Sequence, residues 1–202
     1  MMAIACVLIA YLLGSLPTGY LLGQYLCQRD IRQLGSGNTG ATNALRTLGL
    51  QIGLTTFFVD AFKGMLALYL CFLTDQGPKI IALVMVAVEL GHCYSLFLSF
   101  QGGKGVATFC GLLAMMDIRL FLVFGLVFVL VVLWTGLVSL ASLSASLGVF
   151  LVACFLMPYA WPIKLALLLL LALIFYRHKS NILKLRQGQE YAFGRSSFLK
   201  RF

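Results

Sequence analysis

The chain has 202 residues, of which 61% are hydrophobic and 10% are charged, and its formal net charge is +9. A soluble core cannot hide that much apolar surface, so the composition excludes a soluble globular protein and predicts one integral membrane domain over residues 1–202. In a membrane protein an excess of Lys and Arg records orientation, so the charge does not indicate nucleic-acid binding. The six cysteines contain no C-x-x-C pair and lie in or beside apolar segments, which argues against a disulfide framework and against a metal site.

Seven apolar segments predict an all-α polytopic protein. A helix needs roughly 20 apolar residues to cross about 30 Å of hydrocarbon. The first three segments are long enough, whereas the fourth, fifth and seventh are short and need a thinned bilayer or a buried position among longer helices. The first segment has no basic region or cleavage site before it, so we expect it to be retained. The segments are residues 3–26, 52–73, 80–100, 106–116, 120–134, 140–157 and 163–176.

Basic residues indicate how these segments cross the membrane. If the first segment runs from outside to inside, eleven of the fifteen Lys and Arg residues lie in inner loops, and only Lys79, Arg119 and Lys164 lie in outer ones. We therefore expect the N-terminus outside and the C-terminus in the cytoplasm. Segments four and five must both cross or both fail to cross, because otherwise the basic tail would lie outside. Seven spans are expected, with five as the alternative.

A glycine-rich stretch follows the first segment, with the sequence Gly35-Ser-Gly-Asn-Thr-Gly-Ala-Thr-Asn-Ala-Leu-Arg46. Glycines let backbone N–H groups turn toward one point, and a short helix over 41–48 would direct its positive end to the same point. The stretch predicts a phosphate cradle, although an ordinary polar loop between two spans would have a similar composition. The candidate ligand-binding residues are Ser36, Gly37, Asn38, Gly40, Thr42, Asn43 and Arg46.

A second glycine-rich loop, Gly102-Gly-Lys-Gly105, lies on the same predicted side of the membrane. Flanking glycines allow the backbone to approach an anion while Lys104 supplies a point charge. The loop is not a Walker A sequence, because glycine rather than Ser or Thr follows the lysine. The alternative is a flexible turn whose lysine only sets the topology. Gly102, Gly103, Lys104 and Gly105 are the candidates here.

Serines at helical spacing begin the sixth segment, at positions 139, 142 and 146. Small hydroxyl residues on one helix face usually serve close packing. Ser142 is the one that we assign to a ligand.

The seventh segment ends in Tyr176-Arg-His-Lys-Ser-Asn181. If the helix continues through this stretch, Arg177, His178 and Asn181 share a face. Arg and Lys at the inner end of a span are normally a topology signal. His178 could be a general base or a hydrogen-bond donor to an anion, with Asn181 beside it.

Ionisable residues inside the spans form two candidate pairs. Charged groups are costly in a membrane and normally face a partner or a cavity. We interpret Asp60 and Lys63 as a structural pair that supports the first glycine loop. Glu89 and His92 are expected to form a second buried pair.

Taken in order, these sequences resemble the bacterial acyl-phosphate:glycerol-3-phosphate acyltransferases. The resemblance extends to about Glu190, and Tyr191 and the residues after it lie outside the pattern. In that last stretch Arg195, Lys200 and Arg201 would hold the tail to anionic lipid. The matching stretches are Ala-Tyr-Leu-Leu-Gly-Ser (10–15), the 35–46 sequence, Asp-x-x-Lys-Gly (60–64), Gly-His (91–92), Gly-Gly-Lys-Gly-Val-Ala-Thr (102–108), Ser-Leu-Ala-Ser (139–142) and Tyr-Arg-His-x-x-Asn-Ile (176–182).

The resemblance implies a bacterial inner-membrane enzyme of phospholipid synthesis whose active site faces the cytoplasm. It would transfer an acyl group from acyl phosphate to the 1-hydroxyl of sn-glycerol 3-phosphate, giving lysophosphatidic acid and phosphate. No cofactor is implied, and neither acyl-CoA nor acyl carrier protein is the direct donor. On this hypothesis the 35–43 loop and Lys104 hold the acyl phosphate. Glycerol 3-phosphate is held by Arg46, Lys104, Ser142, His178 and Asn181, and either His178 or the departing phosphate takes the proton.

Two other classes of protein compete with this interpretation. A transporter for an organic phosphate would explain the intramembrane charges, but transporters usually bind near the bilayer midplane between repeated halves. Here the polar sequences lie at one surface, and the halves do not match. A scaffold for lipid-synthesis enzymes would leave the glycine loops unexplained.

Overall fold

A computed structural model of the chain describes residues 1–192, so the tail residues Arg195, Lys200 and Arg201 lie outside the described part. Within residues 1–192 the regular elements are all helical, which confirms the predicted all-α class. The helices are α1 (Met2–Ser15), α2 (Thr18–Cys27), α3 (Ala41–Leu48), α4 (Leu50–Phe72), α5 (Pro78–Cys93), α6 (Val106–Met116), α7 (Ile118–Thr135), α8 (Val138–Phe155), α9 (Trp161–Arg177) and α10 (Lys179–Arg186), with short 3-10 turns η1 (Ile31–Gln33) and η2 (Leu96–Leu98).

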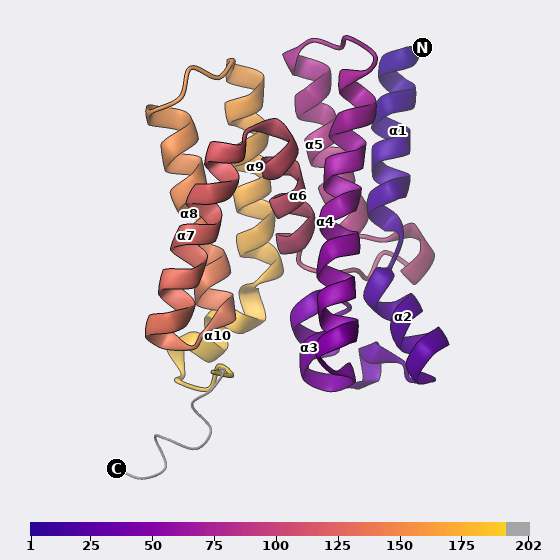
Figure 1. The fold of residues 1–202 in the computed structure, drawn as a ribbon, viewed down its shortest axis with the longest axis vertical. Helices are drawn as coiled ribbons and strands as arrows, with labels where there is room; N and C mark the ends of the chain where they lie inside the picture. The colour runs from indigo at the N-terminus through magenta and orange to yellow at the C-terminus, as the bar shows by residue number, and fades with distance from the viewer. Residues whose placement is uncertain (193–202) are drawn as a thin grey trace.

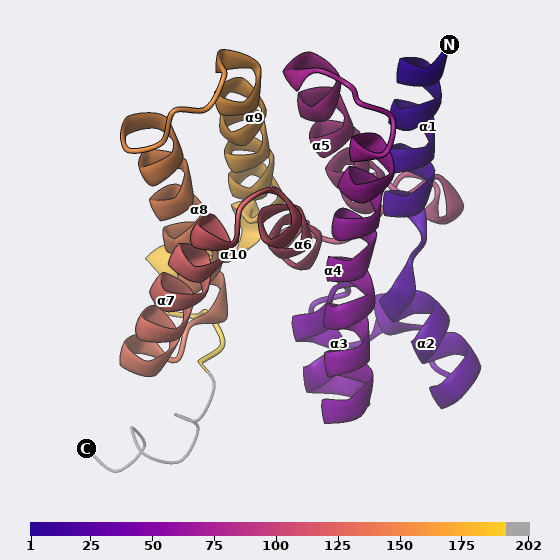
Figure 2. The same cartoon turned by 45° about the horizontal axis from the view of Figure 1, so that its top comes forward.

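The long helices form two groups with α6 between them (Figures 1 and 2). One group contains α1, α4 and α5, and the other contains α7, α8 and α9. The N-terminus lies at the upper end of the bundle in Figure 1, whereas α2, α3 and α10 lie at the lower end. The polar stretches of the first half and the second half therefore approach each other at the lower end.

By length and composition, five stretches of the described residues are able to cross a membrane, and the bent pair α9 and α10 is a sixth. Each of the seven predicted segments is helical. The one predicted crossing that is too short to be counted among these six is α6, which has only 11 residues. Seven of these residues are buried. A short helix is tolerated at membrane depth where protein surrounds it, because its terminal polar groups then avoid lipid. Seven crossings stay a prediction.

The first predicted segment, 3–26, is not one continuous helix, because it breaks at Leu16 and Pro17. The Lys63 ammonium donates to the carbonyl of Leu16. Lys63 also lies 2.5 Å from the Asp60 carboxylate, which accepts a hydrogen bond from Thr18 at 2.7 Å. The predicted pairing of Asp60 with Lys63 is thus confirmed, but the pair bonds to the break between α1 and α2 rather than to the first glycine loop, and it joins the two sides of this break to α4.

Two expectations about the third segment are wrong. Helix α5 ends at Cys93 rather than near residue 100, because the backbone leaves the helical region at Tyr94, with φ −130° and ψ 64°. Glu89 and His92 do not pair with each other. The His92 ring turns toward α4, where Nδ1 lies 4.0 Å from the Asp60 carboxylate. The Glu89 carboxylate is fully buried, lies against the backbone of Gly105, and has no hydrogen-bond partner within residues 1–192.

Candidate active site

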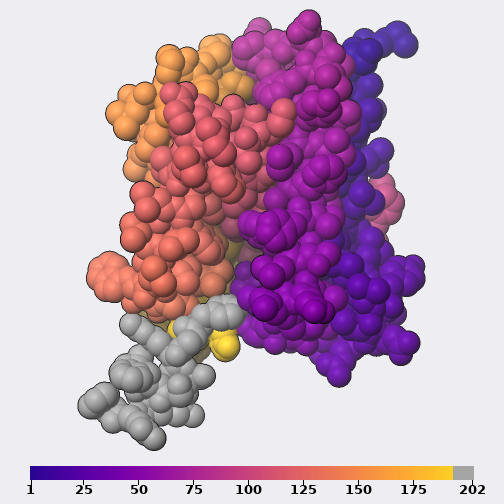
Figure 3. Space-filling model, in the orientation of Figure 1, coloured from indigo at the N-terminus to yellow at the C-terminus, as the bar shows by residue number. Residues whose placement is uncertain are grey.

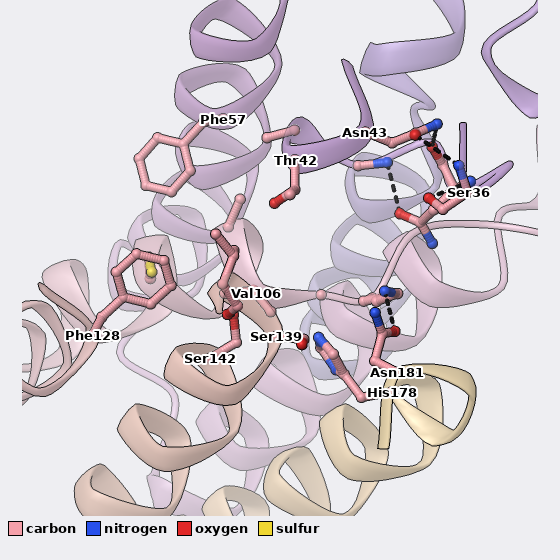
Figure 4. A pocket seen from close by; sticks show the side chains of 18 of the residues that line it. Ser36, Thr42, Asn43, Phe57, Val106, Phe128, Ser139, Ser142, His178 and Asn181 are labelled. Atoms are coloured by element: carbon pink, nitrogen blue, oxygen red, sulfur yellow. Dashed lines mark hydrogen bonds between the residues drawn. The ribbon is translucent and has the colours of Figure 1, made fainter. Parts of the chain in front are cut away.

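A cavity of about 310 Å³ opens in the lower half of the molecule, between the two groups of helices. Both glycine loops reach it, which satisfies the main geometric requirement of the sequence hypothesis. Figure 4 shows side chains from both halves of the chain pointing into this space. The predicted residues that line it are Ser36, Asn38, Gly40, Thr42, Asn43, Arg46, Lys104, Gly105, Ser142, His178 and Asn181. Gly37, Gly102 and Gly103 are not among the lining residues.

The first glycine loop is folded around the side chain of Asn43, which is buried. Its amide oxygen accepts a hydrogen bond from the backbone of Ser36 at 3.0 Å, and its nitrogen donates to the carbonyls of Leu34 and Asn38 at 3.0 and 2.9 Å. Gly35 has φ +57°, and a Cβ there would overlap the Asn43 side chain. Glycine is therefore required at this position by both backbone angle and space.

The anion-binding groups of this loop differ from those that the glycines suggest. The amides of Ser36, Gly37 and Gly40 are already bonded within the loop. Within residues 1–192, the backbone amides of Ala41 and Thr42, in the first turn of α3, donate to no other group. Unpaired amides at a helix N-terminus attract anions. The start of α3, rather than the glycine amides, therefore presents the donors.

Lys104 connects the second loop to the C-terminal part of the site. Its ammonium donates to Asn181 Oδ1 at 2.5 Å, and Asn181 Nδ2 donates to Glu190 Oε1 at 2.7 Å. Burial lowers the pKa of Lys104 to about 8, with Glu190 opposing the shift and Arg46 adding to it. Lys184, another lining residue, also lowers the pKa of Lys104. This end of the cavity is therefore cationic and suited to phosphate.

Gly102 and Gly103 have a structural role that the sequence did not indicate. Their amides donate to the carbonyls of Cys93 and His92 at 3.1 and 3.0 Å. Their carbonyls accept from the Arg177 guanidinium at 2.8 and 3.0 Å. The loop is thus held between α5 and α9, and its amides are occupied. Arg177 presents Lys104 to the cavity by fixing the backbone before it.

The condition under which Arg177, His178 and Asn181 would share a face is not met, because α9 and α10 meet at His178 with a bend of 59°. The bend turns Arg177 toward the 102–103 backbone, whereas His178 and Asn181 line the cavity. His178 Nδ1 lies 2.8 Å from the carbonyl of Ile174. Because a carbonyl only accepts, we assign the proton to Nδ1, which leaves Nε2 as an acceptor.

The other end of the cavity is apolar. Phe57 from α4 faces Phe128 from α7 across the space in Figure 4, and Phe121 and Phe124 of α7 also line it. Figure 3 shows the surface hollowed between α7 and the lower part of α4. The sequence could not reveal this groove, because a phenylalanine that lines a cavity looks like one that faces lipid. Seven polar lining residues were also missed as members of the site, namely Asp60, His92, Ser139, Lys184, Gln189, Glu190 and Tyr191.

The fold and the cavity define a multi-pass membrane protein with a site for a ligand that is anionic at one end and apolar at the other. The family model for glycerol-3-phosphate acyltransferase matches residues 4–188. The chain belongs to this family, which confirms the resemblance seen in the sequence and identifies an enzyme rather than a transporter or a scaffold.

Relatives and solved structures agree with this assignment. The chain is 44% identical over 198 residues to glycerol-3-phosphate acyltransferase 2 of Moorella thermoacetica, covering 97% of this chain and 100% of the relative. It is 41% identical over 200 residues to the glycerol-3-phosphate acyltransferase of Limosilactobacillus reuteri, covering 98% and 95%. A crystal structure of PlsY, an integral membrane glycerol 3-phosphate acyltransferase in its glycerol 3-phosphate form, superposes with a TM-score of 0.92 at 37% identity, covering 96% of each chain.

Proposed function

We propose that the protein transfers a fatty acyl group from an acyl phosphate to the 1-hydroxyl of sn-glycerol 3-phosphate, forming lysophosphatidic acid and phosphate. The observation that carries the proposal is the composition of the cavity. Arg46, Lys104 and Lys184 line its polar end, and four phenylalanines together with aliphatic residues line its apolar end. Two phosphates and one acyl chain match these two surfaces. One of the related PlsY structures is a lysophosphatidic acid form, which supports this product.

The acyl phosphate lies with its phosphate at the first glycine loop and its chain in the phenylalanine groove. Ser36 and Thr42 line the cavity on this side, beside the unpaired amides at the start of α3. These amides and Lys104 oppose the negative charge of the phosphate. The remaining loop residues, Gly37, Asn38, Gly40 and Asn43, hold the loop in shape, and Gly102, Gly103 and Gly105 do the same for the second loop.

Glycerol 3-phosphate is bound by Arg46, Lys104, Ser142, His178 and Asn181. The cations take its phosphate, because charge-assisted hydrogen bonds to phosphate are stronger than neutral ones. His178 Nε2, an acceptor by our assignment, accepts a hydrogen bond from the 1-hydroxyl and so turns the hydroxyl oxygen toward the acyl carbon. This arrangement supplies the orientation that makes an intermolecular reaction effectively unimolecular.

The chemical step needs no covalent enzyme intermediate, because an acyl phosphate is a mixed anhydride and is already activated. The 1-hydroxyl oxygen forms a bond to the acyl carbon while the bond from that carbon to the phosphate oxygen breaks. The hydroxyl proton passes to the departing phosphate. Lys104 and the α3 amides stabilise the charge that develops on the reacting oxygens.

We place this single membrane domain in the bacterial inner membrane, with the cavity at the cytoplasmic side where glycerol 3-phosphate is dissolved. The eleven-to-three distribution of basic residues supports that orientation. Membrane lipid surrounds the bundle and contacts the groove between α4 and α7. The direct donor is acyl phosphate rather than acyl-CoA or acyl carrier protein.

An assay with competing donors tests the proposal. The purified chain in detergent receives radiolabelled glycerol 3-phosphate together with one of three acyl donors, namely acyl phosphate, acyl-CoA or acylated acyl carrier protein. We expect labelled lysophosphatidic acid only with acyl phosphate. Lys104→Met should abolish this product. Lys164→Met is the matched control, because Lys164 bonds the carbonyl of Cys154 in the α8–α9 region and does not line the cavity. Product formed from acyl-CoA alone would contradict the proposal.

A further inference from the structure

Three serines lie about one turn apart on α8, but only two of them are hydrogen-bonded. Ser142 Oγ donates to the carbonyl of Val138 at 2.9 Å, and Ser146 Oγ donates to the carbonyl of Ser142 at 2.8 Å. Bonds of this kind are a common arrangement for serine inside a helix. Ser139 is the second residue of α8, so no carbonyl of this helix lies one turn before it. Its hydroxyl has no hydrogen-bond partner within residues 1–192, although the residue is only 6% exposed.

The Ser139 side chain is part of the cavity wall, and its hydroxyl oxygen is almost fully shielded from solvent. Ser139 lines the main cavity, and Figure 4 shows its oxygen beside the His178 ring. A buried hydroxyl without a partner is unfavourable, so a ligand that supplies one gains affinity. The cations Arg46 and Lys104 bind the phosphate of the acceptor. A neutral hydroxyl next to His178 instead complements a neutral polar group of the same ligand.

Glycerol 3-phosphate carries hydroxyls on two neighbouring carbons. Under the proposed function, His178 binds the 1-hydroxyl, and Ser139 is the adjacent group that is not yet used. We propose that Ser139 binds the 2-hydroxyl of glycerol 3-phosphate and selects this acceptor over analogues that lack that hydroxyl. An acceptor without it leaves the buried serine unpaired, which is the condition under which polar sites discriminate most strongly.

The experiment compares two acceptors that differ only in this group. Binding of glycerol 3-phosphate and of 3-hydroxypropyl phosphate to the purified full chain is measured by calorimetry, for wild type, Ser139→Ala and Ser146→Ala. We expect wild type to bind glycerol 3-phosphate about tenfold more tightly than the analogue. Ser139→Ala should lose about tenfold for glycerol 3-phosphate and nothing for the analogue. Ser146→Ala, which alters a hydroxyl outside the cavity, should keep the wild-type difference.

Equal weakening of both ligands by Ser139→Ala would overturn the proposal, as would no weakening at all. Gel filtration and thermal unfolding check that the variant is folded. If it is not, Ser139→Cys, which keeps the size but bonds weakly, supports the same comparison. The measurement needs no acyl donor. Failure of acyl phosphate in the donor assay would therefore overturn the proposed function and leave the Ser139 comparison valid.

Discussion

Lys104 is a partly buried cation in a site for anions, so its ionisation should control binding. Burial lowers its pKa to about 8, and the ammonium is therefore lost as the pH rises through this value. Because the protonated form binds phosphate, we expect the affinity for glycerol 3-phosphate to be constant below pH 7.5. Above pH 8 it should fall by about tenfold per pH unit. Calorimetric titrations between pH 6.5 and 9.5 measure this.

Lys104→Arg provides the control, because a guanidinium stays protonated throughout this range. The variant should bind more weakly at pH 7, since its geometry toward Asn181 differs, but its affinity should not fall above pH 8. A decline identical to that of wild type would show that another group titrates.

Substitution of His178 tests whether this residue orients the acceptor hydroxyl or takes its proton. Its Nδ1 is bonded to the carbonyl of Ile174, and the departing phosphate is itself a suitable base. We expect His178→Ala to raise KM for glycerol 3-phosphate by about 10–100-fold with a smaller effect on kcat, because a positioning contact is lost. Steady-state kinetics with acyl phosphate at saturation measure both constants. Loss of turnover with unchanged binding would instead identify His178 as the base.

Single residues differ in how far their roles can be predicted. Lys104, His178 and Asn181 occur in distinctive polar sequences, and all three reach the cavity. Tyr191 carries no such signal, yet its ring lies 4.0 Å from the Arg46 guanidinium. Among the α8 serines, Ser142 was favoured because it was expected to lie nearest the inner surface of the membrane. Spacing could not show that Ser139 lacks a partner, because hydrogen bonding depends on where the helix begins.

At the level of helices, α7 forms one wall of the apolar groove. Gly125 lines the cavity, and no atom lies within 4 Å of the place where its Cβ would be. We expect Gly125→Leu to fill the groove and to lower kcat/KM for a 16-carbon acyl phosphate at least tenfold more than for a 10-carbon one. Folding should be retained, because leucine favours a helix more than glycine does, by somewhat less than the about 0.8–1 kcal/mol that separates alanine from glycine.

Gly148→Leu in α8 is the matched control for Gly125→Leu, since Gly148 does not line the cavity and a Cβ there would meet only Val127, at 3.6 Å. It should leave the chain-length preference unchanged. Equal losses with both donors in Gly125→Leu would contradict the placement of the acyl chain.

The connection between α9 and the second glycine loop depends on Arg177. Its guanidinium bonds two successive carbonyls, so Arg177→Met should release the loop that presents Lys104. We expect a loss of about 10–100-fold in kcat/KM, expressed mainly in KM, because a misplaced cation binds phosphate poorly. Lys179→Met is the matched control. Lys179 lies over the Tyr176 ring, 5.0 Å from its centroid, and does not line the cavity. Similar losses in both variants would argue against this role.

The ends of helices were predictable where hydropathy changes sharply along the sequence, and less predictable where it does not. The limits of α3 and α6 were predicted correctly, because Gly40 and Gly105 precede them. The end of α5 was missed because Leu96 and Phe97 keep the following turn apolar. The bend at His178 was missed for a different reason, since nothing in the local sequence breaks a helix there.

For the whole molecule, orientation is the property that remains to be tested. Alkaline phosphatase needs disulfide bonds that form only outside the cytoplasm. Fused after Asp75, in the connection between α4 and α5, it should be active, and fused after residue 202 it should be inactive. An odd number of crossings places these sites on opposite sides of the membrane. The reverse pattern would contradict the basic-residue argument, and equal activities would exclude an odd number.

The groove between α4 and α7 also determines how the product departs. Under the proposed function, water-soluble glycerol 3-phosphate enters at the lower end of the bundle, while the acyl chain of the donor would occupy the groove between Phe57 and Phe128. A newly made lipid can then slide sideways into the leaflet without ever being extracted into water. The reaction thus takes place at a boundary between two phases, and turnover should depend on the fluidity of the surrounding lipid as well as on the chemistry.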